Sequence, residues 1–267
     1  MVERLACELS RSWAGGKITD PPSTPYPEIG INTAYAIEAE LRRLRIAAGH
    51  AVVGRKVGYA NKAMWRVLKL NTLVWASMYD DTVHEAATFP VLSLEKYFSP
   101  RIEPEIVFKL KKAPGAGLDA AGALECVEWM ALGFEIIDCP FPGWDFKPAD
   151  FIAAYGLHRA LVVGEHRAVD SAAVPVLVDQ LASFQVRLLR NGELAEEGSG
   201  KNSLRSPALC LAELAKAAMN QAFSTPLEAG ELISTGTLTG AHSPAAGETW
   251  HAEAEGLPVA PLTLRFS

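Results

Sequence analysis

The stretch Ser99–Lys112 (SPRIEPEIVFKLKK) is the feature that most limits how this chain can fold. Apolar residues such as Ile106 and Phe108 make it typical of a buried β-strand, yet it also contains Glu103 and Glu105. Because residues two apart on a strand point the same way, both carboxylates share one face. Two like charges on an apolar strand repel each other unless a positive group lies between them.

A third carboxylate occurs in a similar setting. Glu135 lies in Ala131–Asp138 (ALGFEIID), again surrounded by apolar residues. Three carboxylates with no matching histidine or cysteine ligands suit a hard cation such as Mg²⁺ or Mn²⁺. The spacing leaves a second interpretation open, in which Glu103 lies at the surface beside Pro104 and only Glu105 is interior.

The composition is that of a globular protein with a substantial core and excludes several other classes. Of its 267 residues, 49% are hydrophobic, and the formal net charge of −6 argues against a general nucleic-acid-binding protein. No window contains the roughly eighteen unbroken apolar residues of a membrane helix, and Met1–Trp13 lacks the apolar core of a secretory signal. The four cysteines form no C-x-x-C pair, so we expect free thiols in a cytoplasmic protein.

Hydrophobic periodicity predicts an α+β fold in two parts. Met1–Ala14 and a segment from Asn32 to about Ala48 show apolar residues near helical spacing, and Asn32 or Thr33 is the expected cap of the second helix. We therefore expect an N-terminal helical segment, 1–50. In the remaining domain, 51–267, strands dominate without a regular β-α-β rhythm.

Local signals place the elements of this second part. Asn191-Gly192 predicts a β-hairpin, because both residues tolerate a positive φ. Helices are expected at Ala120–Trp129, Val174–Ala182 and Ser206–Gln221. The expected strands are Ala51–Val57, Arg101–Leu110, Leu132–Ile137, Leu161–Gly164, Phe184–Arg190, Glu231–Thr235 and Leu262–Phe266.

Six short motifs follow one another along the chain in an order that resembles a known family. They are Gly54-Arg55-Lys56-Val57-Gly58, Asp80-Asp81, Glu103-x-Glu105, Glu135-Ile136-Ile137-Asp138, Ala149-Asp150 and Gly236-Thr237-Leu238-Thr239-Gly240. Together they resemble the fumarylacetoacetate hydrolase superfamily, in particular its 2-keto-4-pentenoate hydratase and 4-oxalocrotonate decarboxylase branch. The resemblance implies a mixed β-roll core of the C-terminal-domain type of that family, a Mg²⁺ or Mn²⁺ ion, a small keto-acid substrate and a homo-oligomer.

The resemblance also implies roles for individual residues. Glu103, Glu105 and Glu135 match the three metal carboxylates of the family, and Lys56 matches the lysine of its G-x-K-x-G motif. On its apolar setting alone, Lys56 could simply be a buried ion pair; the alternative is a catalytic group whose pKa is lowered by burial.

Three further positions match motifs of the family. Asp81 corresponds to the aspartate of an x-D-D-M motif, with Thr82 where the family has methionine, although Asp80-Asp81 is also typical of a turn. Gly236 and Thr237 correspond to a loop at the carboxylate end of the substrate. On the residues alone, that Gly- and Thr-rich stretch is a strand and a turn.

The chain departs from the family after Asp150. Where the hydratase branch carries a D-N-A-S-S-G-type stretch, this sequence has Ala154–Arg159 (AYGLHR). We expect Tyr155 or His158 to replace the hydrogen bonds of the serines, and Arg159 to bind a second substrate carboxylate. The alternative is that Arg159 points to solvent while only Tyr155 and Leu157 pack inward. Four aromatic residues could be pocket walls or ordinary core: Trp65, Trp75, Phe141 and Trp144.

The resemblance implies a metal-dependent lyase. The first expectation is hydration of 2-hydroxypenta-2,4-dienoate to 4-hydroxy-2-oxopentanoate in aromatic catabolism, with Lys56 and Asp81 transferring protons. Decarboxylation of a 4-oxalocrotonate-type diacid is the second. The third is a non-catalytic family member that binds a keto acid.

Overall fold

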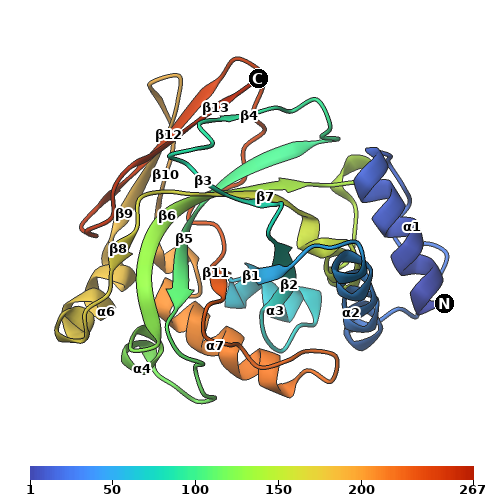
Figure 1. The fold of residues 1–267 in the computed structure, drawn as a ribbon, viewed down its shortest axis with the longest axis horizontal. Coiled ribbons are helices and arrows are strands. Elements are labelled where there is room, and N and C mark those ends of the chain that lie inside the picture. The colour runs from blue at the N-terminus through green and yellow to red at the C-terminus, as the bar shows by residue number, and fades with distance from the viewer.

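The computed structural model describes residues 1–267 and places them in two β-sheets flanked by helices (Figure 1). The larger sheet is mixed: seven of its strands follow the order β2-β1-β11-β5-β6-β7-β3, and β8 pairs with β6 beside them. Its strands are β1 (Val52–Gly58), β2 (Val74–Tyr79), β3 (Val83–Glu85), β5 (Pro100–Leu110), β6 (Val127–Asp138), β7 (His158–Val163), β8 (Arg167–Ala168) and β11 (Leu232–Ser234).

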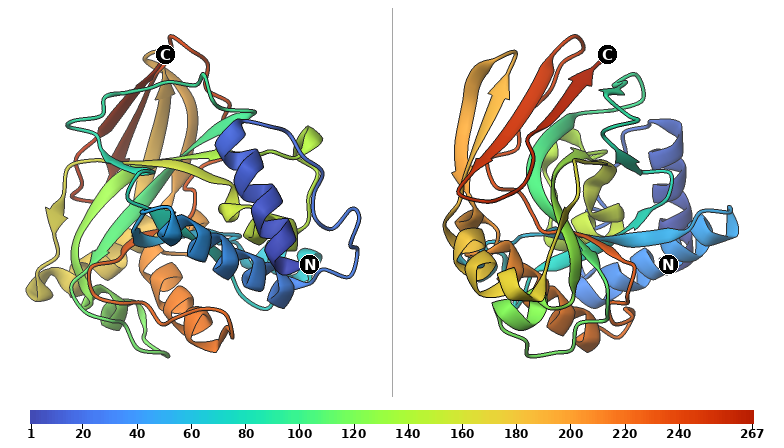
Figure 2. Two further views of the ribbon diagram at one scale, coloured as in Figure 1. Left: turned by 45° about the vertical axis from the view of Figure 1, so that its right-hand side comes forward. Right: turned by 60° about the vertical axis from the view of Figure 1, so that its left-hand side comes forward.

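The second sheet has five strands in the order β10-β9-β12-β13-β4, and it projects beside the larger sheet (Figure 2). The Asn191-Gly192 turn joins β9 to β10, with φ of 53° and 85° at its two residues, which confirms the predicted hairpin. The strands are β4 (Val91–Leu92), β9 (Gln185–Arg190), β10 (Glu193–Ser199), β12 (Thr249–Glu255) and β13 (Leu262–Phe266).

Helices lie around the larger sheet (Figures 1 and 2). In Figure 1, α4, α6 and α7 lie along the lower side, while α1 and α2 pack together at the right. The helices are α1 (Val2–Gly15), α2 (Ile31–Ala47), α3 (Lys62–Leu68), α4 (Ala120–Leu124), α5 (Pro148–Ala153), α6 (Val174–Ser183) and α7 (Pro207–Asn220), with short 3-10 turns at Pro142–Trp144, Tyr155–Leu157, Ser171–Ala173 and Gly200–Asn202. The predicted α+β fold with curled strands and N-terminal helices is confirmed. None of these helices has the length and apolar character needed to cross a membrane.

Two local predictions were wrong. The helix expected over Ala120–Trp129 ends at Leu124, because Val127 and Trp129 pair with β5 at the start of β6, and this long-range pairing overrides the local helical pattern. The second helix begins one residue before Asn32, at Ile31, and is preceded by Gly30 without a side-chain cap.

The N-terminal segment is tied to the rest of the chain by a buried carboxylate. Asp150, at the start of α5, is fully buried and accepts hydrogen bonds from the Ser23 N–H and hydroxyl, both at 2.7 Å. It also accepts the Lys147 N–H at 2.9 Å. In addition, α2 packs on α5 and β2. The division at residue 50 stays a prediction.

Candidate active site

The structure brings together the three carboxylates that stood out in the sequence. Glu103 on β5 lies directly opposite Glu135 on β6 in an antiparallel ladder, and Glu105 is two residues further along the same face of β5. One oxygen from each carboxylate lies within 4.8 Å of the others. Glu105 and Glu135 are fully buried, whereas Glu103 is partly exposed to the adjoining cavity.

Glu105 is held by the loop that follows β11. Its Oε2 accepts the Gly236 N–H at 2.8 Å and the Ser234 hydroxyl, while Oε1 is buried without a hydrogen-bond partner. Gly236 has a φ of +91°, which favours glycine and lets the backbone turn its N–H toward the carboxylate. Across the ladder, a Cβ at Gly133 would lie 2.5 Å from Val107, so β6 needs a glycine opposite Glu105.

Glu135 is held by two basic side chains. His158 Nδ1 lies 2.9 Å from Oε1 and Lys56 Nζ lies 3.0 Å from Oε2. The other ring nitrogen of His158 lies 3.0 Å from the Thr82 hydroxyl. Burial, reinforced by the positive charge of Lys56, lowers the pKa of His158 far below its usual value. We therefore assign a neutral imidazole whose Nδ1–H donates to Glu135 and whose Nε2 accepts from Thr82.

Lys56 sits on β1 with only 2% of its surface exposed. Its ammonium donates to the Gly156 carbonyl at 3.0 Å and lies 4.9 Å from the centre of the Phe151 ring. A Cβ at Gly156, whose φ is +60°, would lie 3.0 Å from the Lys56 side chain, so this glycine makes room for the lysine.

The expectation that the pKa of Lys56 lies below its usual value was wrong for the protein without a bound metal. Burial is the largest single influence and lowers the pKa, but Glu135, Glu103 and Glu105 together raise it above its usual value. The ammonium is therefore a charged partner of the carboxylate cluster.

The donor set fits a divalent cation. The three carboxylates and the one Lys56 ammonium leave two negative charges uncompensated when all are ionised. Burial and mutual repulsion raise the pKa of Glu103 and of Glu105 to about 8, since each carboxylate is costly to ionise in this setting. Glu105 Oε1 is buried and accepts no hydrogen bond, and the only partner of Glu135 Oε2 is the Lys56 ammonium, 3.0 Å away. Clustered carboxylate oxygens of this kind are ligands that Mg²⁺ or Mn²⁺ prefers.

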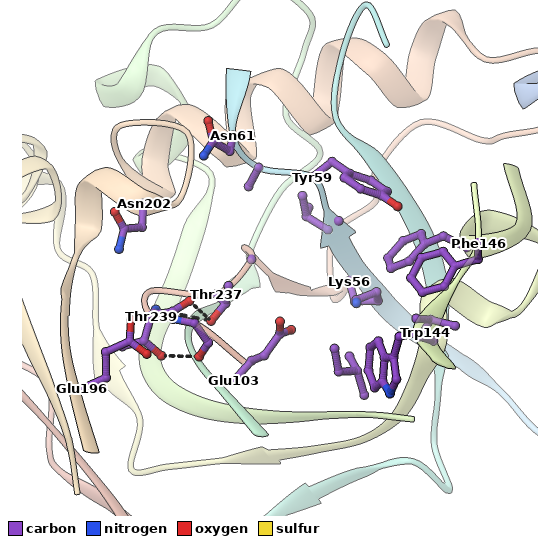
Figure 3. Close-up of a pocket in the computed structure, with 18 residues that line it drawn as sticks. Lys56, Tyr59, Asn61, Glu103, Trp144, Phe146, Glu196, Asn202, Thr237 and Thr239 are labelled. Atoms are coloured by element: carbon purple, nitrogen blue, oxygen red, sulfur yellow. Dashed lines mark hydrogen bonds between the residues drawn. The ribbon is translucent and has the colours of Figure 1, made fainter. Parts of the chain in front are cut away.

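A cavity of about 420 Å³ opens onto Glu103 and Lys56 (Figure 3). Trp144 and Phe146 lie on one side of these two residues in this view, and Thr237, Asn202 and Glu196 lie on the other. The predicted residues Gly236 and Thr237 line the cavity, and so does Trp144. Three other aromatic candidates belong to the core and are absent from its lining: Trp65, Trp75 and Phe141.

The structure does not bring two other predicted residues, Asp81 and Arg159, to this cavity. Asp81 pairs with Arg45 on α2 and lines a different hollow on the protein surface. Arg159 lines that same hollow, and its guanidinium donates to the backbone carbonyls of Trp13 and Lys96. Neither side chain is therefore placed to act on a molecule beside Glu103.

Tyr155 and His158 also differ from their expected role. The Tyr155 ring packs against the rings of Trp13 and Tyr79, at 5.4 and 6.3 Å between centroids. His158 does not line the cavity and instead contacts Glu135 in the protein interior. In this stretch, His158 therefore supports the Glu135 carboxylate and Tyr155 packs in the core. Neither side chain lies at the cavity surface, where we expected them to replace the serines.

Several cavity residues carried no clear signal in the sequence. Tyr59 and Asn61 come shortly after β1. Their closeness to Lys56 in the sequence was the only indication that they line the same cavity. Phe146 is two residues from Trp144. Glu196 and Asn202 come from a polar hairpin strand and the turn after it, where charged and amide side chains are typical of a solvent-exposed surface.

Comparison with known proteins agrees with this architecture. Residues 75–264 match the family model described as fumarylacetoacetate (FAA) hydrolase C-terminal. A 2-hydroxyhexa-2,4-dienoate hydratase of Comamonas testosteroni is 31% identical over 96% of this chain and 94% of its own. A 4-oxalocrotonate decarboxylase of a Pseudomonas species is 29% identical over 90% and 89%.

A solved structure shares the fold throughout. The 4-oxalocrotonate decarboxylase from Pseudomonas putida G7, complexed with magnesium and adipate, has a TM-score of 0.89 and 24% identity, covering 100% of this chain and 97% of that one. Together with the family model, which spans residues 75–264, these likenesses show that the chain belongs to the fumarylacetoacetate hydrolase family.

Proposed function

We propose that this protein is a metal-dependent lyase that hydrates 2-hydroxypenta-2,4-dienoate, or a close homologue, to a 4-hydroxy-2-oxo acid. The observation that carries the proposal is the cluster of Glu103, Glu105 and Glu135 beside the Lys56 ammonium at the cavity. The hydratase names of relatives such as that of Comamonas testosteroni support the same reaction class.

Glu103, Glu105 and Glu135 would hold the cation. A bound Mg²⁺ or Mn²⁺ supplies positive charge that offsets the negative charge developing on the 2-oxygen and carboxylate end of the substrate. Gly236 and Ser234 keep Glu105 oriented through their hydrogen bonds, and His158 does the same for Glu135.

Lys56 is the proposed proton-transfer group. Hydration begins when the 2-hydroxyl of the dienol loses its proton and C5 gains one, which gives the conjugated 2-oxo-3-enoate. Water then adds its oxygen at C4 and a proton at C3. Lys56 Nζ is the one cationic group that lines the cavity, and it is fixed by Glu135 and the Gly156 carbonyl. Trp144 and Phe146 form an apolar wall on one side of the cavity.

Asp81 is left out of this proposal, because it is paired with Arg45 away from the cavity. Gly236 and Thr237 are kept as residues that contact the substrate. The resemblance also predicts a homo-oligomer, which light scattering of the purified protein would test.

Turnover of 2-hydroxypenta-2,4-dienoate, followed by its ultraviolet absorbance, tests the function. We expect loss of the dienoate with Mg²⁺, no loss with EDTA, and no release of CO₂. Release of CO₂ from 2-oxohex-3-enedioate, with the dienoate unchanged, would instead assign the decarboxylase reaction. Metal binding without turnover of either compound would assign a non-catalytic keto-acid-binding protein.

A further inference from the structure

The cavity has an uneven distribution of charge. Among its lining residues, Lys56 is the one cationic side chain, and it is already paired with Glu135. The acidic lining residues are Glu103, which belongs to the carboxylate cluster, and Glu196, which lies well away from Lys56 in Figure 3. A ligand that occupies this cavity therefore meets a second anion beyond the carboxylate cluster.

Glu196 is built into its position. A β-bulge between Leu194 and Glu196 interrupts the β9–β10 ladder, and bulges of this kind redirect a side chain. The Glu196 carboxylate accepts the Gly240 N–H at 3.0 Å and also contacts His242 Nε2. A Cβ at Gly240 would lie 3.0 Å from the carboxylate, so a glycine there permits the close approach.

These contacts favour the charged form of Glu196. Partial burial acts to raise its pKa, but the hydrogen bonds from Gly240 and His242 outweigh burial and hold the pKa below its usual value. When His242 is protonated, its charge is paired with Glu196. In neither state does this end of the cavity offer a free positive charge.

The opposite side of the cavity offers no cation besides Lys56, which is already paired with Glu135. It is formed by Trp144, Phe146 and Phe151, whose rings suit an apolar tail. The Arg101 guanidinium stacks on Trp144, 3.7 Å from the ring centre, but Arg101 does not line the cavity.

From this distribution we infer that the cavity selects 2-oxo acids with an uncharged tail, and that Glu196 is the residue that excludes a second carboxylate. The inference rests on the proposed function, which places the 2-oxo acid end at Glu103 and Lys56. It goes further by separating monoacids from diacids. A tail that ends in a methyl group can lie against either side of the cavity. A tail that ends in a carboxylate would have to lose its hydration beside an anion or an aromatic wall.

The test compares two saturated ligands that differ only at C6, 2-oxohexanoate and 2-oxohexanedioate. Their dissociation constants are measured by calorimetry on the Mg²⁺-loaded protein, since neither has the double bond that turnover needs. We expect the monoacid to bind at least about tenfold more tightly. Glu196→Gln should improve binding of the diacid several-fold and change that of the monoacid less than about twofold, because the amide keeps the size of the side chain.

Glu197→Gln is the matched control. It removes the same charge from the next residue of β10, whose exposed side chain does not line the cavity, so the preference should stay as in the wild type. Equal or tighter binding of the diacid to the wild type would overturn the inference while leaving the proposed function standing. Equal effects of the two substitutions would assign the preference to overall charge and would also overturn the role of Glu196. If neither acid binds, or if binding persists in EDTA, the inference and the proposed function both fail.

Discussion

Glu103 and Glu135 face each other directly across the β5–β6 ladder, one carboxylate opposite another in a sheet interior. Like charges in this arrangement destabilise a pair of strands. Lys56 offsets one of the charges, and two remain when all three carboxylates are ionised. A fold that contains such a pair is therefore organised around a cation.

Mg²⁺ should raise the melting temperature of the protein, and Glu105→Gln should abolish most of the rise. Ligand at about 100 times its dissociation constant stabilises the folded state by about 2.7 kcal/mol, provided that the ligand binds the folded state alone. Glu193→Gln, at an exposed position of β10, is the control and should keep the full rise. The measurement is thermal unfolding with MgCl₂ and with EDTA, and an equal rise in both variants would contradict the assigned ligand.

Without divalent ions, stability should fall as the pH rises from about 5 to about 8. The pKa values of Glu103 and Glu105 are near 8 in the folded protein and 4.5 ordinarily, so over this window the folded state binds more protons than the unfolded state. Stability decreases with pH wherever that holds. The raised pKa of Lys56 has no effect here, because its usual value of 10.5 lies above the window. The lowered pKa of His158 opposes the fall in stability below about pH 7, but this one group is outweighed by the two glutamates.

Thermal unfolding in EDTA at several pH values measures this dependence. Glu105→Gln removes one titrating group and should flatten it, and Mg²⁺ should reverse the loss most strongly near pH 8, where the carboxylates are ionised. A wild-type melting temperature that rises over this range, with no difference in the variant, would show that the cluster does not titrate as described.

Lys56→Met should lower turnover by a factor of about 10² to 10⁴, the usual contribution of a positioned acid or base. Methionine approximates the length of the side chain but cannot transfer a proton. The carboxylates remain, so the Mg²⁺-dependent rise in melting temperature should persist. Lys112→Met, at an exposed position, controls for loss of a positive charge. Full activity in Lys56→Met would show that Lys56 serves only as the structural ion-pair partner of Glu135.

His158→Ala should weaken Mg²⁺ binding by about 10- to 100-fold, the usual cost of losing a group that orients a metal ligand. The reason is that Glu135 Oε1 loses the Nδ1–H that holds it. His158→Asn supplies a side-chain N–H near the same place and should restore part of the affinity. A calorimetric titration with Mg²⁺ measures each constant, and unchanged affinity in the alanine variant would exclude the positioning role.

Asp150→Asn should lower the free energy of unfolding by about 1–3 kcal/mol without changing turnover per folded molecule. The added amide N–H would replace either Oδ1, which accepts the Ser23 N–H, or Oδ2, which accepts the Ser23 hydroxyl and the Lys147 N–H, so it would face a donor in either orientation. Denaturant unfolding measures the loss, with Asp145→Asn at an exposed position as the control. If both variants lose the same stability, the Ser23–Asp150 contact is not the cause.

The carboxylate cluster could be predicted from the sequence because its signal is local. Glu103 and Glu105 share a face by strand geometry alone, and acids among apolar residues stand out. The family resemblance added Lys56 and the loop at Gly236. What strand periodicity alone could not provide was the ladder register that sets Glu103 opposite Glu135, since register depends on pairing between distant segments.

Contacts from distant segments explain the remaining differences. His158 meets Glu135 through the β6–β7 pairing, and Asp81 is drawn away by Arg45 of α2. Glu196 lies among the polar residues of β10, so its sequence setting predicts a surface position. The bulge and the Gly240 N–H instead direct its side chain toward the cavity. In each case the sequence shows the residue type but does not show which distant residue it contacts.

The adjacency of β5 and β6 also bears on how the protein reaches its native state. These strands are neighbours both in the chain and in the sheet, so closing the loop between them costs little entropy. Lys56 and Gly236, in contrast, come from β1 and from the loop after β11, at opposite ends of the sequence. During refolding, we expect the contacts between β5 and β6 to form before those that bring Lys56 and Gly236 to the carboxylates.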